Sequence, residues 1–282
     1  MILVTGAAGN AAGQVAAGLL AAGQRVRLLV RGGPRDGRPW PPQGAEVVHG
    51  DLRDPAAVDR ALDGVDRALL LIAEDGGAGF AAAPRAAGLE RVVLLSSKAV
   101  SDQEFVGFDN PLYGKHLRGE EAVLGLGVPW TFLRPGGLAS NALRWAVSVR
   151  REGVVRALFP QLAAPLLHPA DLAEVAVAAL LDPGHQGRTL TLTGPETITV
   201  REQVAVLREV SGRPIRFEEV AEQDAAAVLG PSLPPGFIEV YVPVQKQYLT
   251  TTPVVLPTVT EITGKPGRNF RQWAVDHADA FR

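Results

Sequence analysis

A glycine- and alanine-rich stretch near the start of the chain restricts the fold more than any other feature. The sequence begins Met-Ile-Leu-Val and continues TGAAGNAAGQV from Thr5 to Val15. Such a stretch is either flexible filler or a place where the backbone must come close to a ligand without side chains in the way. An apolar strand pattern precedes it and a helical pattern follows it, which favours the second explanation.

The spacing within this stretch predicts a dinucleotide-binding turn. Gly6 can adopt the tight turn that a residue with a Cβ resists, and Gly9 lets the backbone approach a pyrophosphate. Ala12 or Gly13 lets the following helix lie close to the strand. The pattern is Gly-x-x-Gly-x-x-Ala rather than Gly-x-Gly-x-x-Gly, and its place between the first strand and the first helix makes it specific. A Gly/Ala-rich helix start with no ligand is the alternative.

Short apolar segments alternate with helical segments through the first half of the chain. The helical segments carry start and stop signals, such as Asp54 followed by Pro55 at a helix start and Gly127 after a helix end. Strand, helix and strand in repetition predict a parallel sheet with right-handed crossovers. The expected strands are Ile2–Thr5, Val26–Val30, Glu46–His49, Arg67–Ile72, Arg91–Leu95 and Thr131–Leu133.

This regular alternation ends at about residue 150. We therefore expect residues 1–150 to form an NAD(P)-binding Rossmann domain and residues 151–282 to form mainly a substrate-binding lobe, with residues 188–193 returning to the main sheet. Residues 231–257 are rich in proline and β-branched residues and fit no regular element, whereas the final FRQWAVDHADAF predicts an amphipathic helix. The predicted fold class is α/β, a Rossmann-type doubly wound parallel sheet with a smaller C-terminal substrate lobe.

Composition excludes several classes of protein and partner. The 282 residues are 46% hydrophobic with a net charge of −2, and no cluster of Lys and Arg interleaved with aromatic residues suggests a nucleic-acid partner. The absence of cysteine excludes disulfides, thiolate metal sites and a cysteine nucleophile. No apolar run approaches the ~18 residues that span a bilayer, and the start does not look like a signal peptide. We expect a cytoplasmic protein with a small-molecule substrate and no membrane partner; a homodimer is compatible with this.

The end of the second expected strand predicts which dinucleotide binds. Enzymes that prefer NAD place an acid there for the ribose 2′-hydroxyl. This chain has RLLVRGG, with Arg31 at that place and no acid before Asp36. A guanidinium suits a 2′-phosphate, so we predict NADPH rather than NADH. An exposed loop arginine without a ligand is the alternative.

The HGDLRD segment places two further candidates just after the third expected strand. The carboxylate of Asp51 can accept a hydrogen bond from the adenine amino group, and Leu52 can lie against the ring. The alternative is that Asp51 only caps a turn before the next helix. His49 and Asp51 would be two ligands without a third, so we predict no metal site.

These motifs together resemble the extended or atypical short-chain dehydrogenase/reductases, and in particular the NmrA-like family with its type 2 NAD(P)H:quinone oxidoreductases. The likeness covers nearly the whole chain, with the motifs in the family's order. The family contains reductases, epimerase-like enzymes and redox sensors without turnover. The matching segments are VTGAAGN, GDLRDPAAVDRALDGVD with ALLLIA, RVVLLSSKAV, GVPWTFLRPGGLASN and HPADLAEVAVAAL.

The resemblance implies site residues that follow successive strands. Those expected to border the nicotinamide are Pro135, Gly136, Gly137 and Leu138, and Asn141 would face the substrate. The other implied cofactor contacts are Gly6, Ala8, Gly9, Asn10, Ala11, Arg31, Asp51, Leu52, Leu71, Ile72, Ala73, Ser96 and Ser97.

The catalytic residues cannot be assigned from a standard motif, because the Tyr-x-x-x-Lys motif of ordinary short-chain reductases is absent. In NPLYGKHLRGEE, Leu117 stands four residues after Tyr113 where the lysine would be. Tyr113 and His116 can share a helix face, or Lys115 can reach the nicotinamide ribose from a loop before the helix. The structural alternatives are an anchoring role for Tyr113 and a surface pair of His116 with Glu120.

The function predicted from these residues is an NADPH-dependent reductase. It would transfer hydride to a quinone, enone or carbonyl of a small organic molecule, such as an aromatic secondary metabolite. Two alternatives keep the cofactor: an NADP-binding redox sensor without turnover, and an epimerase or dehydratase with no net redox change. The candidate catalytic residues are Tyr113, Lys115 and His116.

Overall fold

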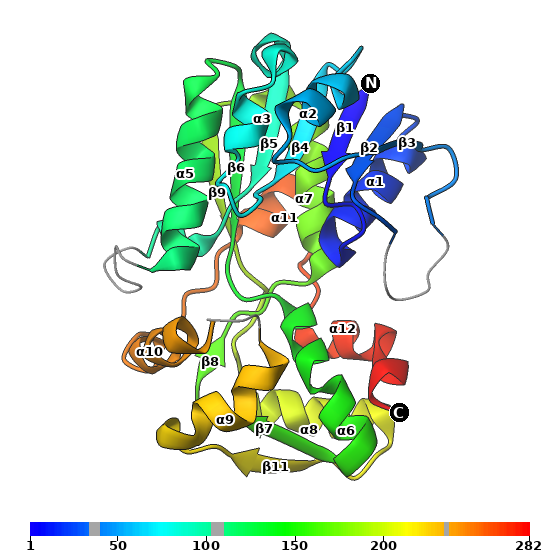
Figure 1. Cartoon of the computed structure of the whole chain (residues 1–282). Helices are drawn as coiled ribbons and strands as arrows, with labels where there is room; N and C mark the ends of the chain where they lie inside the picture. Colours follow the sequence, from blue (N-terminus) through cyan, green and yellow to red (C-terminus); the bar gives the residue numbers. More distant parts are fainter. Residues whose placement is uncertain (34–39, 103–109, 234–236) are drawn as a thin grey trace.

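The computed structural model describes residues 1–33, 40–102, 110–233 and 237–282. In these residues the main body is a seven-stranded parallel sheet with the order β3-β2-β1-β4-β5-β6-β9 (Figure 1). This arrangement confirms the predicted fold class. The strands are β1 (Ile2–Thr5), β2 (Val26–Val30), β3 (Glu46–His49), β4 (Arg67–Leu71), β5 (Arg91–Leu95), β6 (Trp130–Pro135) and β9 (Arg188–Leu192).

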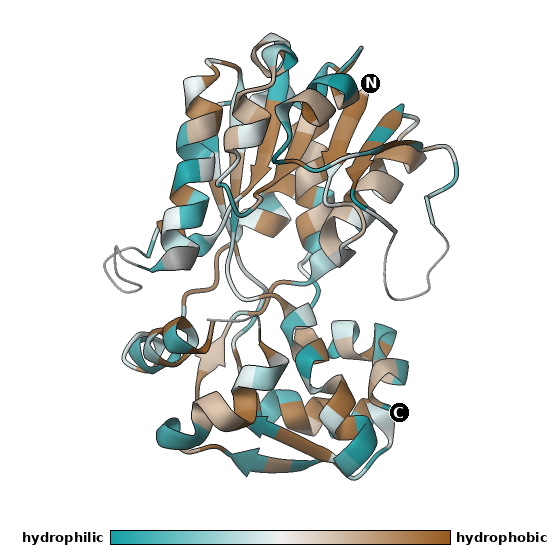
Figure 2. Ribbon diagram, in the orientation of Figure 1, coloured by the Kyte–Doolittle hydropathy of each residue, from teal (hydrophilic) through white to brown (hydrophobic). Residues whose placement is uncertain are grey.

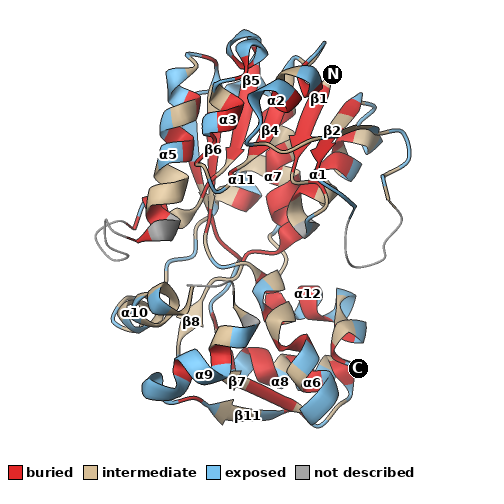
Figure 3. Cartoon of the chain, in the orientation of Figure 1, coloured by how far each residue is buried: buried red, intermediate tan, exposed pale blue. Residues whose placement is uncertain are grey.

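Helices cover both faces of the sheet, which explains why its central strands are apolar on successive residues. Alternate residues of β1 enter different cores: Ile2 and Val4 pack on one face, and Leu3 packs on the other. The central strands are hydrophobic in Figure 2 and buried in Figure 3. The first face is covered by α1 (Asn10–Ala21), α7 (Pro169–Leu181) and α11 (Thr258–Thr263), the second by α2 (Pro55–Ala61), α3 (Ala78–Ala81) and α5 (Pro111–Gly125).

A smaller lobe lies beyond the carboxyl end of β6 and holds two cores of its own (Figure 1). The larger core surrounds Trp273 and Phe270, and the smaller one surrounds Leu158 and Leu229. The elements of the lobe are η3 (Ala139–Trp145), α6 (Ala146–Glu152), β7 (Val154–Ala157), β8 (Ala163–Ala164), β10 (Ile198–Thr199), α8 (Val200–Ser211), β11 (Arg216–Glu219), α9 (Ala225–Leu229), α10 (Ile238–Tyr248) and α12 (Phe270–Asp276).

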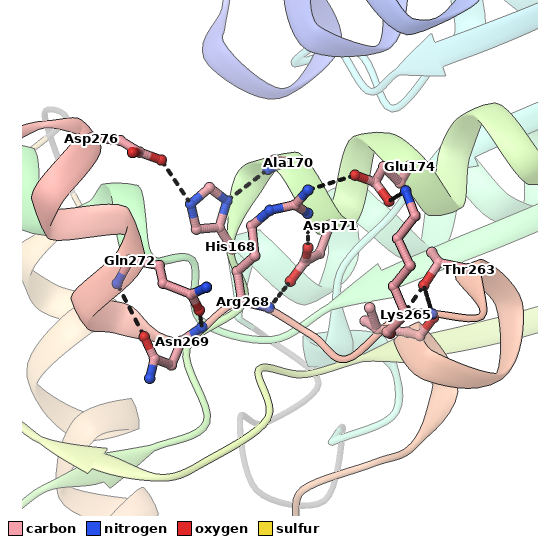
Figure 4. Close-up of polar contacts among 11 residues, drawn as sticks. His168, Ala170, Asp171, Glu174, Thr263, Lys265, Arg268, Asn269, Gln272 and Asp276 are labelled. Carbon is pink, nitrogen blue, oxygen red and sulfur yellow. Dashed lines mark hydrogen bonds and ion pairs between the residues drawn. The ribbon is translucent and has the colours of Figure 1, made fainter.

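The chain does not pass from sheet to lobe only once. After η3 to β8, it returns to the sheet as α7 and β9, enters the lobe again, and returns once more as α11. Polar contacts join these passages at the first turn of α7 (Figure 4). Buried Asp171 accepts from the backbone N–H and the guanidinium of Arg268, whose Nη2 also lies 2.7 Å from Glu174 Oε1.

Two sequence expectations for the second half are wrong or too broad. Residues 238–248 of the stretch expected to be irregular form the helix α10, although Pro243 lies inside it. Packing of Ile238, Tyr241 and Val242 against the smaller lobe core outweighs the low helix propensity of the segment. The last predicted helix is shorter than expected: α12 ends at Asp276, and a 3₁₀ turn follows.

Every helix in the four described ranges is too short or too polar to cross a bilayer.

Candidate cofactor and active site

A long hollow lies along the carboxyl ends of β2, β1 and β4. The strand order changes direction between β1 and β4, since β2 and β3 lie on one side of β1 and β4, β5 and β6 on the other. Nucleotides bind at such a switch point in doubly wound sheets. The residues lining the hollow are Thr5, Gly6, Ala8, Gly9, Leu29, Val30, Arg31, Gly32, Gly33, Gly50, Asp51, Leu52, Arg53, Leu71, Ile72, Ala73, Glu74 and Lys115.

The glycine turn forms the middle of this hollow. Gly6 has a φ of +67°, and a Cβ there would lie 2.3 Å from Leu71 Cδ2. The N–H of Gly9 donates to the Gly6 carbonyl at 2.9 Å, and Gly9 then caps α1, so no capping side chain covers the first turn. The helix therefore presents its positive end to the hollow through a turn that has no room for side chains, which suits a pyrophosphate.

The floor beneath the turn is fixed by Thr5 at the end of β1. Its hydroxyl donates to the Leu69 carbonyl at 3.2 Å and accepts from the N–H of Leu71 at 2.7 Å. These two bonds hold the ends of β1 and β4 together at the point where the strand order reverses.

Cationic side chains gather where the hollow meets β2 and β3. Arg31 is exposed at the end of β2, and Arg53 forms an ion pair with Asp51 at 2.7 Å. Hydrogen bonds from the Arg53 side chain and amide, with a smaller contribution from the charge of Arg31, hold the pKa of Asp51 well below its usual range. This end of the hollow carries two guanidiniums and one carboxylate, and the excess positive charge suits the extra phosphate of NADPH. The sequence analysis did not identify Arg53 as part of this group.

Asp51 was expected either to contact the adenine or to cap a turn, and its observed position is compatible with both roles. Its Oδ1 accepts from the N–H of Arg53 at 2.9 Å, so Asp51 does cap the turn before α2. It also lines the hollow together with Leu52, as the adenine contact requires. Ala11 lies beside the turn in α1, whereas the side chain of Asn10 and all of Asp36 lie outside the described residues.

The three catalytic candidates are all on α5, but they differ in burial and in whether they line the hollow. The alternative in which Lys115 lies in a loop before the helix is wrong, because α5 begins at Pro111. Lys115 lines the hollow, as do Leu71, Ile72 and Ala73. Tyr113 is buried and, like His116, does not line the described hollow. The described structure therefore brings only Lys115 of the three to the hollow.

His116 lies half-buried on α5. Its Nδ1 is buried without a hydrogen-bond partner among the described residues. Burial, together with the neighbouring charge of Lys115, lowers the pKa of His116 to about 4, so the imidazole is neutral near pH 7. The alternative of a surface pair with Glu120 is wrong, because the Glu120 carboxylate is buried in other contacts.

Those contacts connect β5, α5 and β6. Glu120 accepts from the Ser96 hydroxyl at 2.6 Å and pairs with Arg134 through Nε at 2.9 Å and Nη2 at 2.5 Å. The Ser96 hydroxyl therefore faces a protein carboxylate, and Ser97 caps the short 3₁₀ helix η2 (Lys98–Val100). The two serines lie after β5 as expected, but both hydroxyls have roles inside the protein.

A second polar cluster joins the end of β5 to the lobe. Lys98 Nζ lies 2.6 Å from both carboxylate oxygens of Asp102, and the hydroxyl of Tyr248 donates to Asp102 Oδ2 at 2.6 Å. Tyr248 is the last residue of α10, so this contact fixes that helix to the sheet domain. The sequence analysis gave no role to these residues; Lys98 directly after Ser97 was the available signal.

The segment after β6 leads from the sheet to the lobe. Gly136 donates to the Leu192 carbonyl at 3.0 Å, and the Gly137 carbonyl accepts from Leu167 at 2.8 Å. Pro135 ends β6, Leu138 forms a bridge with Leu167, and Asn141 is exposed in η3. This segment lies at the carboxyl end of the sheet, as a nicotinamide contact requires, but outside the lining of the described hollow.

No group of three or more His, Asp or Glu side chains in the described ranges is arranged to hold a metal ion.

Comparison with known proteins gives one family. The sequence matches the NmrA-like family over residues 1–247. It is 44% identical to a (4-alkanoyl-5-oxo-2,5-dihydrofuran-3-yl)methyl phosphate reductase from Streptomyces griseus, with 100% of this chain and 99% of the relative covered. It is 30% identical to the NAD(P)H azoreductase of Xenophilus azovorans, with the same coverage.

A solved structure shows the same architecture with a nucleotide bound. The NADPH-dependent quinone oxidoreductase from Escherichia coli, crystallised in complex with NADPH, superposes with a TM-score of 0.79. It is 25% identical to this chain, and the match covers 98% of this chain and 99% of the other.

Proposed function

The chain belongs to the NmrA-like family, and we propose that it reduces a small, electron-poor organic molecule with NADPH. The observation that carries this proposal is the single hollow in which the glycine turn, Arg31 and Lys115 occur together. The pyrophosphate would lie on the turn at the α1 N-terminus, the 2′-phosphate near Arg31 and Arg53, and the nicotinamide half toward Lys115. The bound nucleotide supplies the hydride.

We propose an acceptor like the one named for the relative from Streptomyces griseus. Its ring double bond is conjugated to the ring carbonyl and to the alkanoyl carbonyl. When the ring carbon that bears the methyl phosphate receives hydride, the electron pair of the double bond moves onto the neighbouring carbon and is shared by both carbonyl oxygens. A proton from solvent then completes the saturated product. The 44% identity over the whole chain supports this substrate class.

Such an acceptor explains how a reductase works without the Tyr-x-x-x-Lys pair. A negative charge shared by two carbonyl oxygens is stable enough that no strong protein acid is needed at the reacting carbon. Neutral His116 and buried Tyr113 are therefore assigned no proton transfer. Lys115, which forms no ion pair with any other described residue, would hydrogen-bond the nicotinamide ribose and orient the ring.

The test is to mix the protein with stoichiometric NADPH and a panel of acceptors and to follow the absorbance of the reduced nicotinamide. The panel holds oxo-dihydrofuran phosphates, quinones and aromatic ketones. Oxidation by the conjugated acceptors supports the proposal. Tight NADPH binding without oxidation by any acceptor would show a sensor, and product without net loss of NADPH would show an epimerase or dehydratase.

A further inference from the structure

Arg144 in the lobe is held in an unusual environment for a cation. Its guanidinium carbon lies 5.1 Å from the ring centroid of Trp145 and 5.4 Å from that of Tyr241. Trp145 is buried and Arg144 itself is half-buried. Aromatic rings attract the flat faces of a guanidinium and leave its N–H groups, which lie in the plane, free to donate. The two rings therefore hold the guanidinium of Arg144 by a contact that does not use its hydrogen-bond donors.

No acid among the described residues neutralises Arg144. The neighbouring Arg156 lines the same small cavity, but it is paired with Glu152 at 2.7 Å and with Glu218 at 2.9 Å. The remaining lining residues are apolar or aromatic: Trp145, Ala157, Leu229, Leu233 and Tyr241. A half-buried cation with unused donors beside apolar walls favours an anionic ligand, because the ligand restores the hydrogen bonds lost with water.

Two observations relate the position of Arg144 to the ends of β5 and β6, where the nicotinamide is expected. The 3₁₀ helix η3 begins directly after Leu138, and at about 2 Å per residue Arg144 lies about 12 Å along it. In α10, Tyr241 and Tyr248 are two turns apart on one face, about 10 Å from each other. The ring of Tyr241 lies beside the guanidinium of Arg144, and the Tyr248 hydroxyl contacts Asp102 in the segment that follows β5. Arg144 and Asp102, which lies just after η2, therefore contact the same face of α10.

We infer that Arg144 binds a phosphate monoester on the substrate while the conjugated ring lies toward the ends of β5 and β6. A guanidinium can donate two parallel hydrogen bonds to a phosphate, which fixes orientation as well as affinity. This inference rests on the proposed function, since the phosphate is a feature of the substrate named for the 44% identical relative.

The test compares a phosphorylated acceptor with its phosphate-free alcohol in steady-state kinetics. Arg144→Met should lower the ratio of kcat/KM for the phosphate ester to that for the alcohol by about tenfold to a hundredfold, chiefly through KM of the ester. Arg144→Lys should recover part of the ratio, because it keeps the charge but loses the paired donors. The control Arg151→Met removes an exposed arginine of α6 and should leave the ratio within about twofold.

A binding measurement separates this inference from the proposed function. Calorimetry with the saturated phosphate ester, which accepts no hydride, should show weaker binding to Arg144→Met than to the unchanged protein, with NADPH affinity retained. Equal losses for ester and alcohol, or an unchanged ratio, would overturn the inference. If none of the acceptors oxidises NADPH in the presence of the unchanged protein, the proposed function fails. Calorimetry then still decides whether Arg144 binds the phosphate.

Discussion

The hollow at the switch point of the sheet and the contacts of the lobe are built in different ways. Apart from Lys115 of α5, the hollow is formed by the carboxyl ends of neighbouring strands and by the turns that follow them, and these strands are recognisable in the sequence. On the lobe side, Tyr248 reaches Asp102 across 146 residues of sequence, and Arg144 lies against Tyr241 of a helix that the sequence did not predict. Sites built on strand–turn–helix corners can be identified from sequence. Sites built where distant segments pack together cannot.

The largest expected effect tests the strand–turn–helix half of this comparison. Gly6→Ala should weaken NADPH binding by on the order of a hundredfold, because the added methyl would meet Leu71 and the left-handed backbone would be strained. Fluorescence titration with NADPH measures this. Gly23→Ala is the matched control: Gly23 has a φ of +73° with nothing within 4 Å of a Cβ. It should lose about 1 kcal/mol of stability and keep its NADPH affinity. Equal affinities in the two variants would contradict the assignment of the turn.

The next effect decides whether His116 belongs to the core or to the active site. Its pKa of about 4 in the folded state lies below the usual 6.5, so between these values the unfolded chain binds more protons. The stabilisation from the neutral imidazole is present above pH 6.5 and is lost as the pH falls toward 4. At pH 5 the loss is on the order of 2 kcal/mol.

Urea unfolding at pH 7 and pH 5 measures this loss. His116→Gln should reduce the difference between the two pH values, whereas His49→Gln, at an exposed position, should not. If His116→Gln instead abolishes turnover while the fold and NADPH binding stay intact, the imidazole takes part in the reaction.

A smaller effect tests the phosphate end of the hollow. Arg31→Asp should lower the preference for NADPH over NADH by at least about tenfold, since a carboxylate repels the 2′-phosphate and accepts from a 2′-hydroxyl. The ratio of kcat/KM for the two nucleotides measures the preference. Arg60→Asp makes the same charge change at an exposed position of α2 outside the hollow, and it should leave the ratio unchanged. An unchanged ratio in Arg31→Asp would assign the selectivity to Arg53 or elsewhere.

The smallest effect tests the lobe side. Tyr248→Phe removes the hydroxyl that donates to Asp102 and should cost about 1 kcal/mol of stability. Hydrogen exchange at the α10 amides should become faster. Tyr241→Phe keeps the ring beside Arg144 and removes a hydroxyl that bonds no described side chain, so exchange there should stay unchanged. If the two variants exchange alike, the Tyr248 contact does not fix α10.

Much of the fold was predictable from the sequence. The predicted bounds of β1, β2, β3 and β5 are confirmed to the residue, because short apolar runs between turn signals permit few other structures. β6 is longer than predicted and runs to Pro135, since pairing with β9 extends it beyond its apolar part. The helix α10 was missed because its packing partners lie elsewhere in the sequence.

For the candidate site, the cofactor contacts were largely predictable from the sequence, whereas the position of Lys115 and the contacts of Glu120 were not predicted. Nine of the implied cofactor contacts line one hollow: Gly6, Ala8, Gly9, Arg31, Asp51, Leu52, Leu71, Ile72 and Ala73. The position of Lys115 was misjudged although a signal existed, since Asn110 before Pro111 is a good helix start and the Asn110 carbonyl accepts from Gly114 at 2.9 Å. For Glu120, Arg134 and Ser96 no local pattern exists, because their contact depends on the packing of three separate elements.

The repeated passage of the chain between sheet and lobe has an evolutionary consequence. Since α7, β9 and α11 belong to the sheet domain while the segments between them build the lobe, no single stretch of the gene encodes the lobe alone. A recombination event that exchanged the lobe as one contiguous block would remove part of the sheet domain with it. Point substitutions within the lobe, in contrast, leave the sheet unchanged.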